Sequence, residues 1–522
     1  MGFRKLLIMN RLVGTGGVVH HLSTSGRGKT AGRLAHLTGT FGIYPVYDPQ
    51  ATLNARETKG VEFRRLCRHL NFEGPSTMTK LLSPLALLAV LFTTAGAFAA
   101  NHYVRAGASG NGSDWTNACG DFTGSCAISS LVRGDTYYVA SGSYGSRTFS
   151  TPNSGSLVIT VKAATVADHG TSTGWQDSYG VGTKPATFAY PIVINSDYWV
   201  FDGQVGSGNT LSSYGFNVAK PTSCNTDPQS YWWIEDKSNI TERYIGIDAC
   251  GNSFNVQQVC FDTGQGSNRT IEHNLGNHCQ NTIKLWNASN DTIQYNQLWN
   301  QWSTPEHHGE SVNNFSTNNI TFRYNYLNGC AGTACIACNV GNQVAMNNWK
   351  IYGNVFINDS SGNGTIAAVQ QVIANTVVYN NTFINITGTG WFLDADPGYG
   401  AQAVNNVLKN NLIFNSTAHF GNNGGPIDHD YNSYFNVTNT PANETHLQKA
   451  SGDPFVNSGA GDYHLKDGTT VDAGLSLGAP YNIDPDGNVR GSDGTWDRGA
   501  YEFGGDGNGQ VDPPSNLEVT VK

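Results

Sequence analysis

Gln294-Tyr-Asn296-Gln-Leu298, Arg323-Tyr-Asn325-Tyr-Leu327 and Tyr352-Gly-Asn354-Val-Phe356 are copies of one phrase, in which an Asn stands two residues before an apolar position at the end of a β-prone run. Further copies place the recurring Asn at Asn274, Asn381 and Asn411. Successive copies are separated by 22, 29, 29, 27 and 30 residues. Repeats of this length are typical of a solenoid in which each period forms one coil.

An apolar alternating run precedes the phrase, as in Thr282-Ile-Lys-Leu-Trp286 ahead of Asp291-Thr-Ile-Gln-Tyr295. Alternation is the period of a strand, and the repeats show no helical periodicity. The 62 Gly and the low charged fraction of 13% also fit a turn-rich β protein. We therefore predict an all-β parallel β-helix. The recurring Asn is expected at a corner, where it adopts left-handed backbone conformation and hydrogen-bonds its equivalents in neighbouring coils.

A secretory signal peptide is predicted over residues 78–99. It begins with Met78-Thr-Lys80, continues as an apolar run to Phe92 and ends at Ala97-Phe-Ala99, so the mature chain is expected to start at Ala100 or Asn101. The Arg-rich residues 1–77 lack periodicity and are interpreted as a disordered upstream extension from a wrongly chosen start codon. The alternative is a signal anchor with a cytoplasmic tail.

The predicted mature chain is acidic. Residues 1–99 hold 12 of the 30 Lys and Arg and 4 of the 39 Asp and Glu, which leaves 18 basic against 35 acidic residues and a net charge of −17. A negative net charge argues against nucleic acid and anionic membranes as partners. It leaves open neutral glycans, and acidic polysaccharides if divalent cations mediate the contact. We expect a secreted, extracellular monomer without stable membrane insertion.

Nine of the ten Cys lie in the predicted mature chain. An oxidising compartment favours disulfides, and Cys119 with Cys126 is the most local candidate. The cluster Cys330-x4-Cys335-x2-Cys338 lacks the second CxxC of a zinc site, so we interpret it as core thiols and a disulfide. The odd total leaves one thiol unpaired.

Three segments together resemble a known family. They are Tyr103–Asn117 with Arg133–Tyr144, the coils over 268–420, and Asp484-Pro-Asp-Gly-Asn-Val-Arg490 through Asp497-Arg-Gly-Ala-Tyr-Glu502. They resemble the opening, the repeats and the closing motif of secreted right-handed parallel β-helix proteins of the pectate-lyase-like superfamily. The resemblance implies a right-handed parallel β-helix with N- and C-terminal caps over 100–503. Residues 504–522 are then interpreted as a linker and the start of a further module.

The closing motif resembles part of a calcium loop but lacks its bidentate Glu. We therefore expect its charged residues to form a charge-paired cap on the last coil. These residues are Asp484, Asp486, Arg490, Asp497 and Glu502.

A polar loop, Trp299-Asn-Gln-Trp302-Ser-Thr-Pro-Glu-His307-His308-Gly-Glu310, is the richest candidate for chemistry. It could supply an acid, a base, a metal ligand and sugar-stacking rings. Because equivalent positions of successive coils stack in columns, residues on neighbouring coils could line the same groove. The predicted catalytic residues are His307, His308, Glu310, Lys284, Asp394 and Asp396. The predicted substrate-binding residues are Trp286, Trp299, Trp302 and Trp391.

The resemblance suggests two chemistries. His308-Gly-Glu-Ser311 is similar to the later half of the Gly-His-Gly-x-Ser strand of β-helix polygalacturonan hydrolases, but the paired Asp and the Arg-x-Lys strand of those enzymes have no match. The calcium-dependent lyases use carboxylates to neutralise a uronate and an Arg or Lys as base. Their resemblance implies Lys284 or Lys350 as the base, and Glu310, Asp394 and Asp396 as Ca²⁺ ligands.

Two functions follow as hypotheses. The first is a secreted carbohydrate-active enzyme that cleaves a polysaccharide, by lyase or glycoside hydrolase chemistry, in a groove along the solenoid. The second is a noncatalytic extracellular module that binds glycan or mediates surface adhesion. Convergence of the candidate side chains in one open cleft would favour the enzyme.

Overall fold

The computed structural model describes residues 99–504, except 183, 225–228, 253–255, 305, 339–343, 369–371, 389, 393–401, 421–426 and 467–472. By its contacts the chain divides into Met1–Ala95 and Gly96–Lys522. The predicted extension, most of the signal peptide and nearly all of the predicted C-terminal linker lie outside the described residues. No helix in the described part of the chain is both long and apolar enough to cross a membrane.

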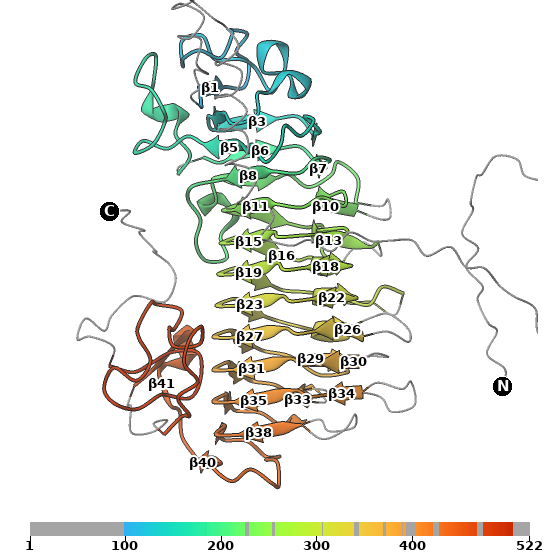
Figure 1. Cartoon of the computed structure of the whole chain (residues 1–522), viewed down its shortest axis with the longest axis vertical. Helices are drawn as coiled ribbons and strands as arrows, with labels where there is room; N and C mark the ends of the chain where they lie inside the picture. Colours follow the sequence, from blue (N-terminus) through green and yellow to red (C-terminus); the bar gives the residue numbers. More distant parts are fainter. Residues whose placement is uncertain are drawn as a thin grey trace, which may run out of the picture. The chain divides into compact units, whose positions relative to one another are not determined.

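The described strands between residues 101 and 450 form a right-handed parallel β-helix, which is the predicted fold class (Figure 1). Within its coils, each strand pairs in parallel with its equivalent one coil away. The strands of the coils belong to four parallel sheets, which we call A to D. Sheet A contains β1 (Asn101–Val104), β2 (Thr136–Val139), β5 (Ile159–Ala163), β8 (Trp199–Asp202), β11 (Ile240–Arg243), β15 (Thr270–Glu272), β19 (Thr292–Gln294), β23 (Thr321–Arg323), β27 (Lys350–Tyr352), β31 (Val377–Tyr379), β35 (Val407–Lys409) and β38 (Asp428–Asp430).

In most coils a strand of sheet B follows the strand of sheet A. It contains β3 (Gly142–Tyr144), β6 (Ala186–Phe188), β9 (Phe216–Val218), β12 (Ile245–Asp248), β16 (Leu275–Asn277), β20 (Gln297–Trp299), β24 (Tyr326–Asn328), β28 (Val355–Ile357), β32 (Thr382–Ile384), β36 (Leu412–Phe414), β39 (Ser433–Phe435) and β40 (Gln448–Ala450).

Sheet C, which carries the longest strands, comes next. It contains β4 (Arg147–Phe149), β7 (Ile192–Ile194), β10 (Gln229–Ile234), β13 (Gln258–Asp262), β17 (Asn281–Trp286), β21 (Glu310–Phe315), β25 (Ala334–Cys338) and β29 (Ile366–Ala368). Sheet D leads back to sheet A and contains β14 (Gly266–Ser267), β18 (Ala288–Ser289), β22 (Thr317–Asn318), β26 (Val344–Asn347), β30 (Val372–Ala374) and β34 (Gln402–Val404).

The remaining described elements are small. They are the parallel pair β33 (Gly390–Phe392) and β37 (His419–Phe420), the antiparallel pair β41 (Phe455–Asn457) and β42 (Asp462–Leu465), and the 3-10 turns η1 (Gly124–Cys126), η2 (Ile128–Ser130), η3 (Asp177–Tyr179), η4 (Leu211–Ser213) and η6 (Ser458–Ala460).

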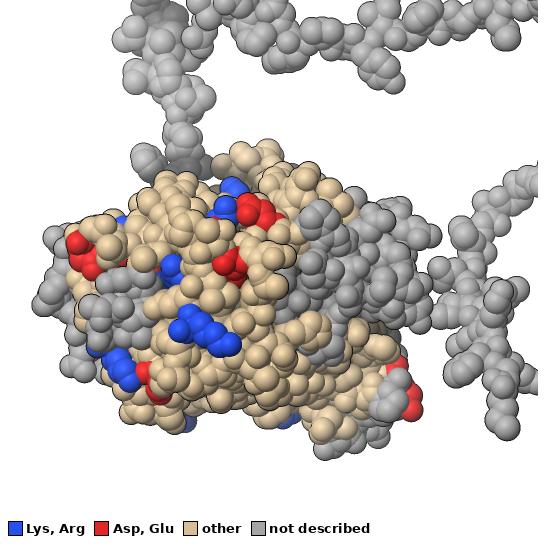
Figure 2. Space-filling model, turned by 90° about the horizontal axis from the view of Figure 1, so that it is seen from below, with Lys and Arg blue, Asp and Glu red and all other residues tan. Residues whose placement is uncertain are grey.

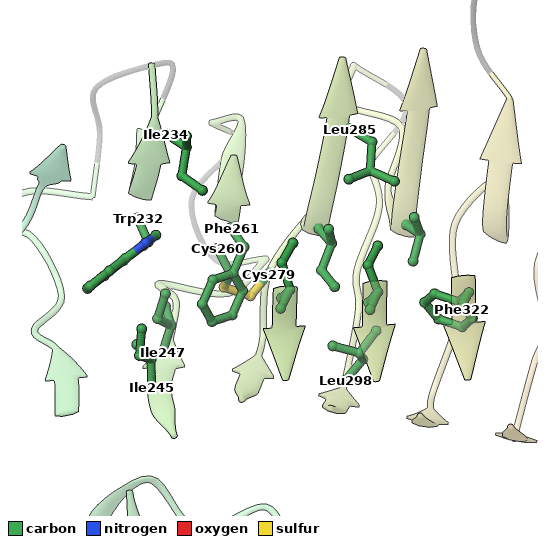
Figure 3. Packing of buried hydrophobic residues seen from close by; sticks show 14 of the residues in the cluster. Trp232, Ile234, Ile245, Ile247, Cys260, Phe261, Cys279, Leu285, Leu298 and Phe322 are labelled. Carbon is green, nitrogen blue, oxygen red and sulfur yellow. A yellow bond between two sulfur atoms is a disulfide. The ribbon is translucent and has the colours of Figure 1, made fainter. Parts of the chain in front are cut away.

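Apolar side chains from all faces of the coil fill the inside of the solenoid. Trp232, Ile234, Phe261, Leu285 and Phe322 belong to this one cluster and are at most 1% exposed (Figure 3). They alternate with outward residues along their strands, which is the strand period seen in the sequence. One continuous core therefore runs through the coils.

The recurring Asn forms a buried ladder at the corner between sheets A and B. The backbone N–H of Asn296 donates to Oδ1 of Asn325 at 3.0 Å, and that of Asn325 to Oδ1 of Asn354 at 2.9 Å. The predicted hydrogen bonding is confirmed, and Asn432 extends the ladder by one coil. The predicted left-handed conformation is wrong, because the preceding residue carries the positive φ, as in Tyr295 (φ 56°). The recurring Asn is buried, and its side-chain amide hydrogen-bonds within the ladder.

At its C-terminal end the Asn ladder is closed by the carboxylate of Glu444, which accepts the last hydrogen bonds. The backbone N–H and the side-chain amide of Asn432 both donate to Oε1 of Glu444, at 2.6 and 2.8 Å, and the Tyr434 hydroxyl donates to Oε2 at 2.9 Å. Figure 2 views the molecule from this end, where some Lys and Arg side chains lie beside Asp and Glu side chains and others stand alone. Lys409 with Asp428, at 3.1 Å, is one ion pair there.

The predicted charged closing motif pairs internally, and it lies along the flank of several coils as well as on the last one. Arg490 and Glu502 are buried and 3.3 Å apart, and the backbone N–H of Glu502 donates to Asp484. The segment runs along the flank of the β-helix (Figure 1). There the Tyr324 hydroxyl donates to the carbonyl oxygen of Ile483 at 2.9 Å, and the backbone N–H of Ala500 donates to Thr382. Arg498 donates to the carbonyl oxygen of Asn432 in the last coil at 3.2 Å, so the segment covers inner coils and the last coil.

The cysteine predictions are confirmed. Cys119 pairs with Cys126, and Cys330 with Cys335, while Cys338 is a buried free thiol. Two further disulfides are present, Cys224 with Cys250 and Cys260 with Cys279.

Asn354→Ala is expected to lower the free energy of unfolding by about 2–4 kcal/mol, because it leaves the buried backbone N–H of Asn325 without its acceptor and takes one acceptor from the Asn325 side-chain amide. Asn318→Ala is the matched control, since it removes an exposed Asn that accepts one hydrogen bond from Asn347. Urea unfolding of both variants checks this. Equal losses would show that the buried ladder adds nothing beyond the exposed contacts.

Candidate functional site

The outer face of sheet C carries a column of unlike side chains. Strand pairing aligns Trp233 with Asp262, Asp262 with Lys284, and Lys284 with Asn313. The residues just before them, such as Trp232 and Ile283, are buried in the core. Alternation along the strands therefore turns this column outward.

An open hollow of about 490 Å³ lies over this column on β7, β10, β13 and β17. At its centre Nζ of Lys284 is 3.3 Å from Oδ2 of Asp262, and the Ser230 hydroxyl donates to the same oxygen at 2.9 Å. The side chains of Lys284 and Asp262 are 23% and 11% exposed. A cation and an acceptor are thus held side by side at the floor of the hollow.

Two indole rings flank this pair. Trp233 and Trp286 are 38% and 41% exposed, and among the described residues they are the Trp side chains classed as exposed. Nζ of Lys284 lies 6.0 Å from the centroid of the Trp286 ring, and this ring also packs against Phe315 with centroids 4.8 Å apart. The hollow therefore joins flat apolar surfaces to a polar centre, which is the composition of a sugar-binding site. We call it the sheet C groove.

The predicted loop residues lie elsewhere along sheet C. His307 is half-buried, while His308 is exposed and its Nδ1 lies 3.2 Å from the Thr333 hydroxyl. Glu310 pairs in register with Asn281, three residues before Lys284, which separates the two levels by about 10 Å along the strand. Glu310 is fully buried, on the side of β21 that carries Val312. The structure therefore does not bring its carboxyl group to the open face with Lys284.

The other predicted residues are also dispersed. Trp299 lies on sheet B and stacks on Tyr326 with centroids 5.3 Å apart. Trp302 is only 6% exposed, and its Nε1 donates to the carbonyl oxygen of His278 at 2.9 Å. Its indole is therefore not an open sugar platform. Trp391 lies on β33, and Asp394 and Asp396 lie outside the described residues.

Calcium binding stays a prediction. Within the described ranges, no group of three or more His, Cys, Asp or Glu side chains is arranged to hold a metal ion. Of the three predicted ligands, Glu310 is buried in the coil and the two Asp residues fall in 393–401.

Sequence reasoning missed Asp262, although a signal was present. Asp262 precedes Lys284 by 22 residues, and Asn274 precedes Asn296 by the same number. Aligning the two coils on the recurring Asn places Asp262 beside Lys284, which is their register in the structure. The spacing of the repeat therefore predicts which outward-facing residues of neighbouring coils lie side by side, as well as which residues share the core.

No family model and no curated protein sequence matches this chain. Among solved structures, it is similar to pectate lyase Pel9A, with 16% identity, 78% of this chain and 96% of that chain covered, and a TM-score of 0.44. It is similar to XylC in complex with xylose, with 11% identity, coverages of 77% and 98%, and a TM-score of 0.38. It is also similar to the PL6 family alginate lyase AlyGC, with 13% identity and a TM-score of 0.37, over 67% of this chain and 51% of that one.

Proposed function

We propose that this protein is a secreted enzyme that cleaves a polysaccharide lying in the sheet C groove, with Lys284 at the reacting sugar. One observation carries the proposal: the close Lys284–Asp262 pair lies in one open hollow with the exposed rings of Trp233 and Trp286. An open site on a long regular face suits a polymer, because the chain can extend past the site in both directions.

Each group has a role in binding. The indole faces of Trp233 and Trp286 stack on the apolar faces of sugar rings. Asp262 accepts hydrogen bonds from sugar hydroxyls, while Lys284 donates to hydroxyls or pairs with a sugar carboxylate. The Ser230 hydroxyl fixes the orientation of the Asp262 carboxylate.

We propose lyase chemistry on a uronate-containing chain. The sugar carboxylate acidifies the adjacent C5–H bond. Lys284 first releases a proton from its ammonium group to water, and the amine then takes the C5 proton. The C4–O bond then breaks, a C4=C5 double bond forms, and the leaving oxygen takes up a proton. No water is consumed, and the new sugar end is unsaturated.

Hydrolysis is the second candidate, because Asp236 lines the same hollow as Asp262. A retaining hydrolase needs two carboxyl groups about 5–5.5 Å apart, and an inverting one about 6.5–9.5 Å apart. Oδ1 of Asp236 already accepts the backbone N–H of Gln265 at 2.7 Å, which favours a structural role for Asp236.

The test incubates the purified protein with a panel of acidic and neutral polysaccharides, with and without EDTA. The expected result is ultraviolet absorbance from an unsaturated uronate together with new reducing ends, and loss of both in EDTA if Ca²⁺ takes part. Reducing ends without absorbance would establish hydrolysis. Binding in a pull-down without either product would establish the noncatalytic module and overturn the enzyme proposal.

A further inference from the structure

The first residue of the β-helix is held by a carboxylate at its backbone nitrogen. The N–H of Ala100 donates to Oδ1 of Asp135 at 2.9 Å, and Oδ2 of Asp135 lies 2.8 Å from Nε2 of His102. Asp135 is only 7% exposed. The carbonyl oxygen of Ala100 accepts the N–H of Thr136 at 2.9 Å, which starts the pairing of β1 with β2.

This contact coincides with the end of the predicted signal peptide. Ala97-Phe-Ala99 has the small-residue pattern of a cleavage site, so hydrolysis would fall between Ala99 and Ala100. Both residues are exposed.

We infer that Ala99–Ala100 is the processing site and that Asp135 is the receptor for the amino terminus that cleavage releases. Hydrolysis adds one water across the bond, which leaves a carboxylate on Ala99 and an α-ammonium group on Ala100. The neutral amide donor at Asp135 thereby becomes a cation with three N–H groups. A charge-assisted hydrogen bond to a nearly buried carboxylate is about twice as strong as a neutral one. Maturation therefore fastens β1 to the first coil.

The position of the cut decides whether this ion pair forms. Cleavage after Ala100 would remove the nitrogen that Asp135 binds and place the new terminus on Asn101, whose own contacts lie in the β1–β2 ladder. Of the two starts that the sequence allows, the Asp135 contact selects Ala100.

The first test expresses the full sequence in a secretory host and determines the N-terminus of the exported protein by sequencing and intact mass. Ala100 is the expected first residue. Any other first residue, or export of the uncut chain, overturns the processing site.

The second test compares the exported protein before and after selective acetylation of its α-amine, which restores the neutral amide of the uncut bond. Hydrogen exchange of the β1 and β2 amides is expected to accelerate roughly three- to tenfold on acetylation. In Asp135→Asn the acceleration is expected to disappear. Exchange that is unchanged by acetylation in the unmodified sequence refutes the ion pair, and this comparison does not depend on the folding of the variant.

Discussion

Lys284→Ala is expected to lower kcat/KM on the cleaved polysaccharide by at least about 10²-fold, because it removes the proposed proton acceptor from the centre of the sheet C groove. It also leaves Asp262 without the cation 3.3 Å away. Lys162→Ala is the matched control. Lys162 is another half-buried lysine that pairs with an aspartate, Asp168, but it lies on sheet A. Initial rates of product formation for both variants check the expectation.

Lys284→Arg separates the two roles of the lysine. Arginine keeps the positive charge but does not give up its proton in proteins, so it can pair with a carboxylate and cannot act as a base. If Lys284 is the base, the arginine variant retains substrate binding and loses turnover. If the arginine variant retains most of the turnover of the unmodified protein, Lys284 acts only as a cation. Full activity of Lys284→Ala would contradict the proposed site.

The coil pattern could be predicted because it repeats one physical requirement. Every coil must turn the same corner and satisfy the same backbone groups, and the buried Asn does both through hydrogen bonds to the next coil. The periodic signal therefore reported strand order, direction and stacking. It could not report that the residue before the Asn takes the positive φ, since Tyr, His, Gly and Asn all occupy that position.

The candidate site was only partly predictable, because it depends on which way single side chains point. Lys284 and Trp286 follow strand alternation outward, as expected, and reach the groove. Glu310 and Trp302 come from the loop that is richest in reactive residues, yet both are buried in the structure. An irregular loop that leads into a strand has no periodic pattern from which the direction of its side chains could be inferred. The reactive residue types in the loop made it the predicted site. The observed groove is instead formed by side chains of sheet C that stack on one another from coil to coil.

The interior of the β-helix also contains ionisable side chains that no pattern in the sequence predicted. Glu242, Arg269 and Asp291 are each about 1% exposed, and Arg269 binds Asp291 through Nη2 at 2.8 Å and Nε at 3.0 Å. Burial raises the pKa of Glu242 to about 8, against the opposing charge of Arg269. Burial also raises the pKa of Asp291. The folded protein therefore holds a proton on Glu242 at a pH where the unfolded chain has released it.

The stability of the protein is consequently expected to fall as pH rises from about 4.5 to about 8. In this window the unfolded state binds fewer protons than the folded state, so the free energy of unfolding decreases by at most about 1.4 kcal/mol per pH unit for this one group. Below the window the contribution of Glu242 is fully present, and above about pH 8 it is lost. The charge that then forms in the core must be accommodated beside Arg269 and Asp291.

Glu242→Gln is expected to flatten this dependence, because a glutamine keeps the shape of the protonated side chain and does not titrate. Urea unfolding midpoints between about pH 5 and about pH 9 check this, with the half-buried surface residue Glu235 changed to Gln as the control. A remaining shallow slope is attributed to Asp291, whose raised pKa acts in the same direction. If the unmodified protein and Glu242→Gln lose stability in parallel as pH rises, Glu242 does not hold the proton in the folded state. The titrating group would then have to be sought in the buried pair of Arg269 and Asp291.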